Sequence, residues 1–227
     1  MKNLLYKEFS LCLPMQVPLF LCFSFFILIP NYPYLVAGFF ICNAIFYSFV
    51  QASADNDTLF SLLLPVSKAK TVKGKMTYVI CIQTVALILF AAVTLLSSVI
   101  GKGENDAGTD ASLTLLGGYL LMFCVFNLSY VPHYFKAPHT AGRRFLFSAL
   151  CMLGFAAVFE GLMIAAKPLS ETLPFFSWVE NNLDVFPNSG ASWTAQIVFF
   201  IVCAALYAIL NAVCTKTAIK NFELAEV

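Results

Sequence analysis

Long apolar runs separated by short polar segments make up most of this chain. A membrane-spanning helix needs about 20 apolar residues to cross a hydrocarbon core of about 30 Å. Six runs have that character, and they cover residues 15–29, 34–50, 76–100, 113–131, 145–166 and 194–214. The pattern therefore predicts an all-α integral membrane protein with six transmembrane helices, in which residues 1–227 form a single transmembrane domain.

Composition excludes the main classes of water-soluble protein. The 227 residues are 60% hydrophobic and 11% charged, with a mean hydropathy of +0.85, whereas soluble domains have roughly 25% charged residues. The eight cysteines lie within or beside apolar runs and show no CxxC or CxxH spacing. We therefore expect them to be small buried apolar residues rather than zinc ligands or a disulfide framework.

The net charge of +1 conceals a strong asymmetry between alternate loops. Eleven of the 13 basic residues fall on the side of the membrane that the amino terminus shares, and the opposite side has only Lys102 and Lys167. Basic residues are retained on the cytoplasmic side of a membrane. Both termini are therefore predicted to be cytoplasmic, in agreement with an even number of spans.

Three segments outside the spans have distinct patterns. Residues 1–13 place apolar residues at helical spacing beside two lysines, which is typical of an interfacial helix, or of a frayed start to the first span. Residues 102–112 are rich in Gly, Asp and Asn and predict a solvated loop. Residues 167–193 are apolar but interrupted by three prolines, and they predict an outer-leaflet element of short helices.

The inner segment between the second and third spans, residues 55–68, predicts a short cytoplasmic helix. Asp57 is suited to cap its start, and Pro65 ends it. Between them lie the apolar residues Leu59, Phe60, Leu62, Leu63 and Leu64. Such a helix is costly in water unless it rests on the membrane or enters a groove on another protein, and we favour the groove.

Few residues in the spans could take part in chemistry. Glu160 is the only acid within a predicted span, so it is a candidate for the substrate path or a gate. A role in helix packing, or as a neutral hydrogen-bonded carboxyl, is the alternative. The two histidines, His133 and His139, share a basic inner loop without further metal ligands, which indicates no metal site.

The chain also lacks a nucleotide-binding loop. That loop requires the pattern GxxxxGK[ST], and neither Gly74-Lys75 nor Gly101-Lys102 fits it. We therefore expect no enzymatic activity, no catalytic residue and no cofactor in this chain. Any energy from ATP has to come through a partner that binds the nucleotide.

Two inner loops resemble a known family. Residues 62–68 read LLLPVSK and are followed by TVKGK at residues 71–75. This run resembles the "SLPVSR, IV, xKY" pattern of small bacterial permeases of type-2 ATP-binding-cassette (ABC) transporters. Residues 131–136, VPHYFK, and Gly142-Arg143-Arg144 are similar to that family's "YPLYYKFG, KAR" segment, although Ala137-Pro138 replaces the usual Phe-Gly.

The resemblance implies the permease subunit of an ABC exporter in a bacterial plasma membrane. Its expected partners are an ABC ATPase subunit, a second permease subunit that is either a copy or a different chain, and the lipid bilayer, with no nucleic acid. The segment 55–68 would be the coupling helix, with Asp57, Leu59, Phe60, Leu62, Leu63, Leu64 and Pro65 as its ATPase-coupling residues.

Two other functions are weighed against this one. A non-transporting membrane protein, such as an immunity or sensor subunit bound to another protein, would also present an apolar helix to a partner. An ion-coupled carrier would place several ionisable residues in its spans, and only Glu160 is present. The substrate stays open among a lipid, an amphipathic peptide and a hydrophobic drug.

Overall fold

The computed structural model describes residues 2–11, 15–63, 66–100, 105–137, 140–183 and 193–225. Within these ranges every regular element is helical. The elements are α1 (Lys2–Leu11), α2 (Gln16–Leu21), η1 (Cys22–Leu28), α3 (Leu35–Ala54), α4 (Asp57–Leu63), α5 (Lys68–Val99), α6 (Leu113–Lys136), α7 (Ala141–Leu169), α8 (Pro174–Asn182) and α9 (Trp193–Leu224).

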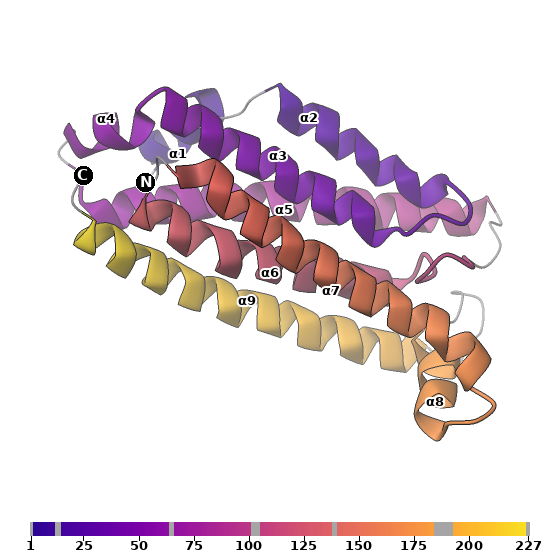
Figure 1. Ribbon diagram of the computed structural model, residues 1–227. Helices are drawn as coiled ribbons and strands as arrows, with labels where there is room; N and C mark the ends of the chain where they lie inside the picture. Colours follow the sequence, from indigo (N-terminus) through magenta and orange to yellow (C-terminus); the bar gives the residue numbers. More distant parts are fainter. Residues whose placement is uncertain are drawn as a thin grey trace.

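The long helices run roughly alongside one another in one bundle (Figure 1). Five of them, α3, α5, α6, α7 and α9, are long and apolar enough to cross a membrane. The two ends of the chain and α4 lie at one end of the bundle, and α8 lies at the other. The chain is therefore a multi-pass membrane protein in which α4 and α8 lie at opposite ends.

The first predicted span is a shorter apolar helix, Gln16–Leu28. It begins as α2 and continues as the 3-10 helix η1, which has seven residues. Because a 3-10 helix rises about 2.0 Å per residue and an α-helix about 1.5 Å, the 13 residues reach about 23 Å. The 3-10 winding thus brings the length of this short helix closer to the thickness of the hydrocarbon core. The count of six spans stays a prediction.

A turn at Pro30–Pro33 reverses the chain before α3. Asn31 has a φ of 52°, in the left-handed region that asparagine tolerates better than most residues. The Tyr34 hydroxyl donates to the carbonyl of Ile29 at 3.2 Å and closes the turn. The first apolar helix and α3 consequently form a hairpin and pack against each other.

Helix α6 lies at the centre of the bundle. It packs along α9 and also contacts α3, α5 and α7. In the most apolar window of each helix, 78% of α6 residues are buried but only 17% of α9 residues. Helix α9 therefore has a large apolar surface that a bilayer would cover.

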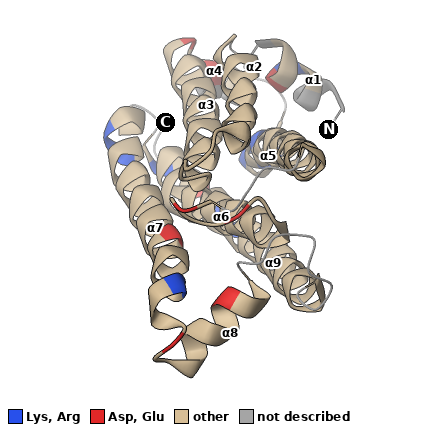
Figure 2. Cartoon of the chain, turned by 90° about the vertical axis from the view of Figure 1, so that its right-hand side faces the viewer, with Lys and Arg blue, Asp and Glu red and all other residues tan. Residues whose placement is uncertain are grey.

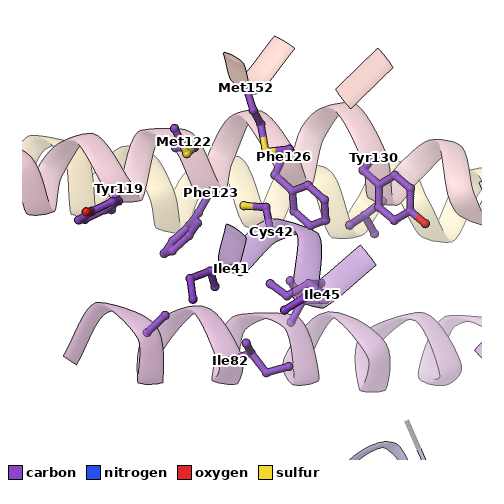
Figure 3. Close-up of a cluster of buried hydrophobic side chains, with 14 of the residues drawn as sticks. Ile41, Cys42, Ile45, Ile82, Tyr119, Met122, Phe123, Phe126, Tyr130 and Met152 are labelled. Atoms are coloured by element: carbon purple, nitrogen blue, oxygen red, sulfur yellow. The ribbon is translucent and has the colours of Figure 1, made fainter. Parts of the chain in front are cut away.

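Aromatic and aliphatic side chains fill the space between α3, α5 and α6 (Figure 3). Ile41 and Ile45 of α3 face Phe123 and Phe126 of α6, and Met152 of α7 reaches the same cluster. At Gly38 a Cβ atom would lie 2.7 Å from the Tyr119 ring, so the absence of a side chain allows α3 to approach α6 closely.

The loop before α6 differs from the solvated loop that composition predicts. Of its described part, residues 105–112, Asp106 is exposed, Ala107 is half-buried and the others are buried. Asn105 accounts for much of this, because its side-chain amide donates to the carbonyls of Tyr32 and Thr109. The prediction of a solvated loop was wrong for these residues, because their polar groups form hydrogen bonds within the protein instead of with water.

Most of the cysteines behave as small apolar residues. Cys42, Cys124, Cys203 and Cys214 are buried, and Cys81 and Cys151 are half-buried. Cys22 is exposed on the first apolar helix, and Cys12 lies outside the described residues.

Candidate functional site

The short helix α4 occupies the inner segment for which sequence predicts a coupling helix. Asn56, with a φ of 52°, makes the sharp turn that separates it from α3. Asp57 is its first residue, so a negative charge lies in the first turn, where the helix dipole favours it. After α4, the Ser67 hydroxyl accepts from the Lys70 amide and caps the start of α5.

Helix α4 has one exposed apolar side and one buried polar side. Phe60 is 56% exposed and Leu63 is 84% exposed. Ser61, between them, is fully buried. The side chains of Leu59 and Leu62, and the whole of Leu64 and Pro65, lie outside the described residues. Of the predicted apolar surface of this helix, the structure therefore describes two side chains, Phe60 and Leu63, and both are exposed.

An ionic cluster anchors α4 from its buried side. Lys7 of α1 places its Nζ 2.6 Å from Asp57 Oδ1, and it donates to Ser61 Oγ at 2.7 Å. The two side chains of the ion pair are 13% and 12% exposed. One lysine thus binds both the first turn and the middle of α4.

The same cluster continues to α5. Lys75 Nζ donates to Glu8 Oε2 at 2.7 Å and lies 4.0 Å from Asp57 Oδ2. Glu8 is 1% exposed and Lys75 is 4% exposed. Phe49 and Tyr78 have ring centroids 5.5 and 5.9 Å from Lys75 Nζ, within the range of a cation–π contact.

Two lysines and two carboxylates therefore form one group that joins α1, α4 and α5. We name Lys7, Glu8, Asp57 and Lys75 the ionic cluster. Buried charges of this kind persist only when they are paired, because removing a single unpaired charge from water costs on the order of several kcal/mol. The pairing connects α4 to α1 through Lys7 and α1 to α5 through Lys75.

Sequence reasoning identified Asp57 but missed the three other members of the ionic cluster. A signal was present, since Glu8 is the only acid before Asp55 and lies in an apolar context. Lys75, however, is 67 residues away from Glu8 in the sequence, and Asp57 is 50 residues away from Lys7. Only the packing of α1 against α5 brings them together.

Glu160 of α7 lies apart from α4 and acts as a hydrogen-bond acceptor for two other segments. Its Oε1 accepts from the Leu35 amide at 3.0 Å, at the start of α3. Its Oε2 accepts from the Thr109 amide at 2.6 Å and the Thr109 hydroxyl at 3.2 Å. A side chain at Gly108, which has a φ of 153°, would overlap the carboxylate.

These contacts give Glu160 a role in fixing the 105–112 loop and the start of α3 to α7. Glu160 is 6% exposed. Two of its three hydrogen bonds come from backbone amides, and the Leu35 amide lies at the N-terminus of α3, where the helix dipole favours a negative charge. A carboxylate with three donors supports the packing alternative that sequence left open for this residue, while the substrate-path role stays a prediction.

A second polar group lies within the spans, between α5, α6 and α9. Gln83 and Asn127 exchange hydrogen bonds of 2.9 and 3.0 Å. Asn127 also donates to Asn211 at 2.7 Å, and Tyr207 donates to Gln83 at 2.7 Å. We name these four residues the amide network. The amide network was not predicted from the sequence, because only charged residues in the spans were taken as candidates and these four residues are neutral.

Apolar cavities flank α8 within the predicted outer-leaflet element 167–193. One of about 400 Å³ lies between α7, α8 and α9, and Phe159, Trp178 and Phe199 contribute to its wall. A second, of about 480 Å³, is lined by Trp178, Val198 and Val202 among others. Residues 184–192 of this element lie outside the described part of the chain.

Within the described residues there is no group of three His, Cys, Asp or Glu side chains that could hold a metal ion. His133 lies at the end of α6 near Arg143 and Arg144 of α7, around a shared cavity. His139 falls outside the described residues.

Comparison with known proteins gives one match of nearly full length. Residues 3–223 match the family described as ABC-2 family transporter protein. No curated protein and no solved structure matches the chain.

Proposed function

This chain belongs to the ABC-2 family of transporter proteins, and from that premise we propose that it is the membrane-spanning permease subunit of an ABC exporter. A separate ATPase subunit would bind and hydrolyse ATP, and α4 would dock into it. The complete transporter would contain two permease subunits, either two copies of this chain or this chain with another. We place it in a bacterial plasma membrane, with six spans and both termini cytoplasmic.

The exposed apolar surface of α4 is the observation that supports this proposal most directly. Phe60 and Leu63 face outward at the end of the bundle that also holds both termini. Burying a side chain of this size in a partner groove contributes about 1.5–3 kcal/mol. In the proposed complex these two side chains would be the anchors of α4 in the groove of the partner.

The ionic cluster explains how docking at α4 would reach the membrane. Movement of α4 passes to α1 through Lys7 and to α5 through Lys75, because these lysines bind carboxylates on both sides. Helix α5 is 32 residues long, and its Gln83 enters the amide network with α6 and α9. A shift of α4 on ATP binding would therefore move α5 relative to the central helix.

Co-purification with an ABC ATPase encoded beside this chain tests the docking role. We expect Leu63→Asp to weaken the complex about 30-fold or more, since it removes about 2 kcal/mol of burial and adds a charge. Leu224→Asp is the matched control, because Leu224 is also an exposed leucine, 74% exposed, on α9.

Loss of the ATPase from Leu63→Asp but not from Leu224→Asp, with equal amounts of both variants in the membrane, supports the proposal. Retention of the ATPase by Leu63→Asp and by Phe60→Asp would contradict it. Wild-type chain that never binds the ATPase, but binds another membrane or cytoplasmic protein through α4, would favour the immunity or sensor function instead.

A further inference from the structure

A basic cavity opens between α6 and α7, away from the ionic cluster and the amide network. It has a volume of about 390 Å³ and is lined by Ser129, His133, Thr140, Arg143, Arg144 and Phe147. None of these described lining residues is acidic. Figure 2 shows basic residues at the end of α7 that lies near the carboxyl terminus, the end of the bundle where α4 also lies.

The arginines of this cavity are available to an anion. Neither Arg143 nor Arg144 forms an ion pair with any residue that the structure describes. Arg144 Nε donates to Thr140 Oγ1 at 3.1 Å, which fixes the guanidinium at the cavity. A guanidinium has five donor hydrogens in a planar fork that matches two phosphate oxygens.

The start of α7 adds to the positive potential. This helix begins at Ala141, and the preceding Thr140 makes no side-chain cap to its first turn. The positive end of a helix dipole favours anions, and α7 is 29 residues long. Two arginines, His133 and the first turn of α7 therefore converge on one cavity.

An apolar track leads away from the arginines along α7. Arg143, Phe147 and Leu150 are spaced i, i+4 and i+7, so they share one face of the helix. Phe147 is 60% exposed and Leu150 is 70% exposed. Val158, two turns further, is 71% exposed, and a Cβ at the intervening Gly154 would meet nothing within 4 Å.

From this arrangement we propose that the cavity binds the phosphate of an anionic phospholipid from the leaflet at the α4 end of the molecule. The headgroup phosphate bonds to Arg143 and Arg144, and one acyl chain lies along Phe147, Leu150 and Val158. The distance from residue 143 to residue 158 along the helix is about 22 Å, which accommodates an acyl chain. A soluble phosphate would gain nothing from the apolar track.

The test measures lipid retention by the full-length chain in native mass spectrometry. The protein is reconstituted in nanodiscs of phosphatidylcholine with phosphatidylglycerol, extracted, and scored for each lipid that stays bound. We expect Arg143→Gln to lower phosphatidylglycerol retention about fivefold and the double change with Arg144→Gln about 25-fold, since each arginine near a membrane surface contributes a factor of about five.

Two controls separate this site from general attraction to a charged membrane. Lys216→Gln with Lys220→Gln removes two exposed charges near the end of α9 and is expected to leave retention unchanged. Arg143→Lys with Arg144→Lys preserves charge but removes the planar fork, so retention should fall partway. Because Arg143 is exposed, we expect the single variant Arg143→Gln to fold normally, so it tests the site even if the double variant is unstable.

Inorganic phosphate, in millimolar excess, distinguishes the source of the phosphate group. In nanodiscs of phosphatidylcholine alone we expect it to leave the melting temperature unchanged, whereas phosphatidylglycerol raises it. A rise with inorganic phosphate that matches the rise with phosphatidylglycerol would overturn the lipid proposal. Equal phosphatidylglycerol retention by wild type and by the double glutamine variant would overturn the site itself.

Discussion

Breaking the Glu8–Lys75 pair should destabilise the protein strongly. The two side chains are 1% and 6% exposed, and the Nζ to Oε2 distance is 2.7 Å. Removing one partner of a buried ion pair costs about 3–5 kcal/mol. We take the lower end, about 3 kcal/mol, for Glu8→Gln, because Lys75 keeps Asp57 at 4.0 Å.

For a chain of this size, about 3 kcal/mol corresponds to a fall in melting temperature of about 6–12 °C. Fluorescence-detected thermal unfolding in detergent or nanodiscs measures this directly. Lys75→Met should cost a similar amount, since it leaves Glu8 buried with Lys7 at 3.5 Å. Lys73→Met, at an exposed position on the same helix, is the matched control and should change the melting temperature by less than about 2 °C.

The double variant of Glu8→Gln and Lys75→Met decides whether the two residues act as a pair. With both charges removed, no uncompensated charge remains between them, so the cost should be well below the sum of the single changes. A change in melting temperature of about 2 °C corresponds to about 1 kcal/mol at most. Single variants that melt within about 2 °C of wild type would therefore refute the reasoning. Strictly additive costs would refute the pairing.

Three further predictions concern the membrane interior, the outer loop and the topology. Asn127→Leu removes three hydrogen bonds of the amide network and should cost about 2–4 kcal/mol in thermal unfolding; no change would mean that the network is dispensable. Glu160→Gln replaces one carboxylate oxygen by an NH₂ group that cannot accept from an amide, so hydrogen exchange at Leu35 or at Thr109 should quicken, and unchanged exchange at both would contradict its anchoring role. After replacement of the native cysteines, a cysteine at Asp106 should react from outside and one at Lys70 from inside, whereas reversed labelling would contradict the predicted orientation.

The apolar pattern predicted the positions of the long helices but not their ends. The third predicted span begins at residue 76, whereas α5 begins at Lys68. Likewise, α9 continues to Leu224, ten residues beyond the predicted end of the last span. Hydropathy marks where a helix is in contact with lipid, but a helix continues wherever its polar side chains find partners, as Lys75 does with Glu8.

The inner helix was predictable because its signals are local. A turn, an acid, an apolar run and a proline lie within about a dozen consecutive residues, and each acts on its neighbours through the backbone. The ionic cluster and the amide network were not predictable from the sequence, because their members come from helices that are far apart in it. The same reason explains the 105–112 loop, which is held in part by Glu160, 51 residues away from Thr109.

Site-specific photo-crosslinking at position 63 tests the central claim most directly. A photoreactive amino acid replaces Leu63 on α4 or, as the control, Leu224 on α9, both of which are exposed leucines. The account predicts that position 63 crosslinks to the ATPase subunit in the assembled complex and that position 224 does so far less. No crosslink from position 63, or equal crosslinking from both positions, would contradict the docking of α4 on an ATPase.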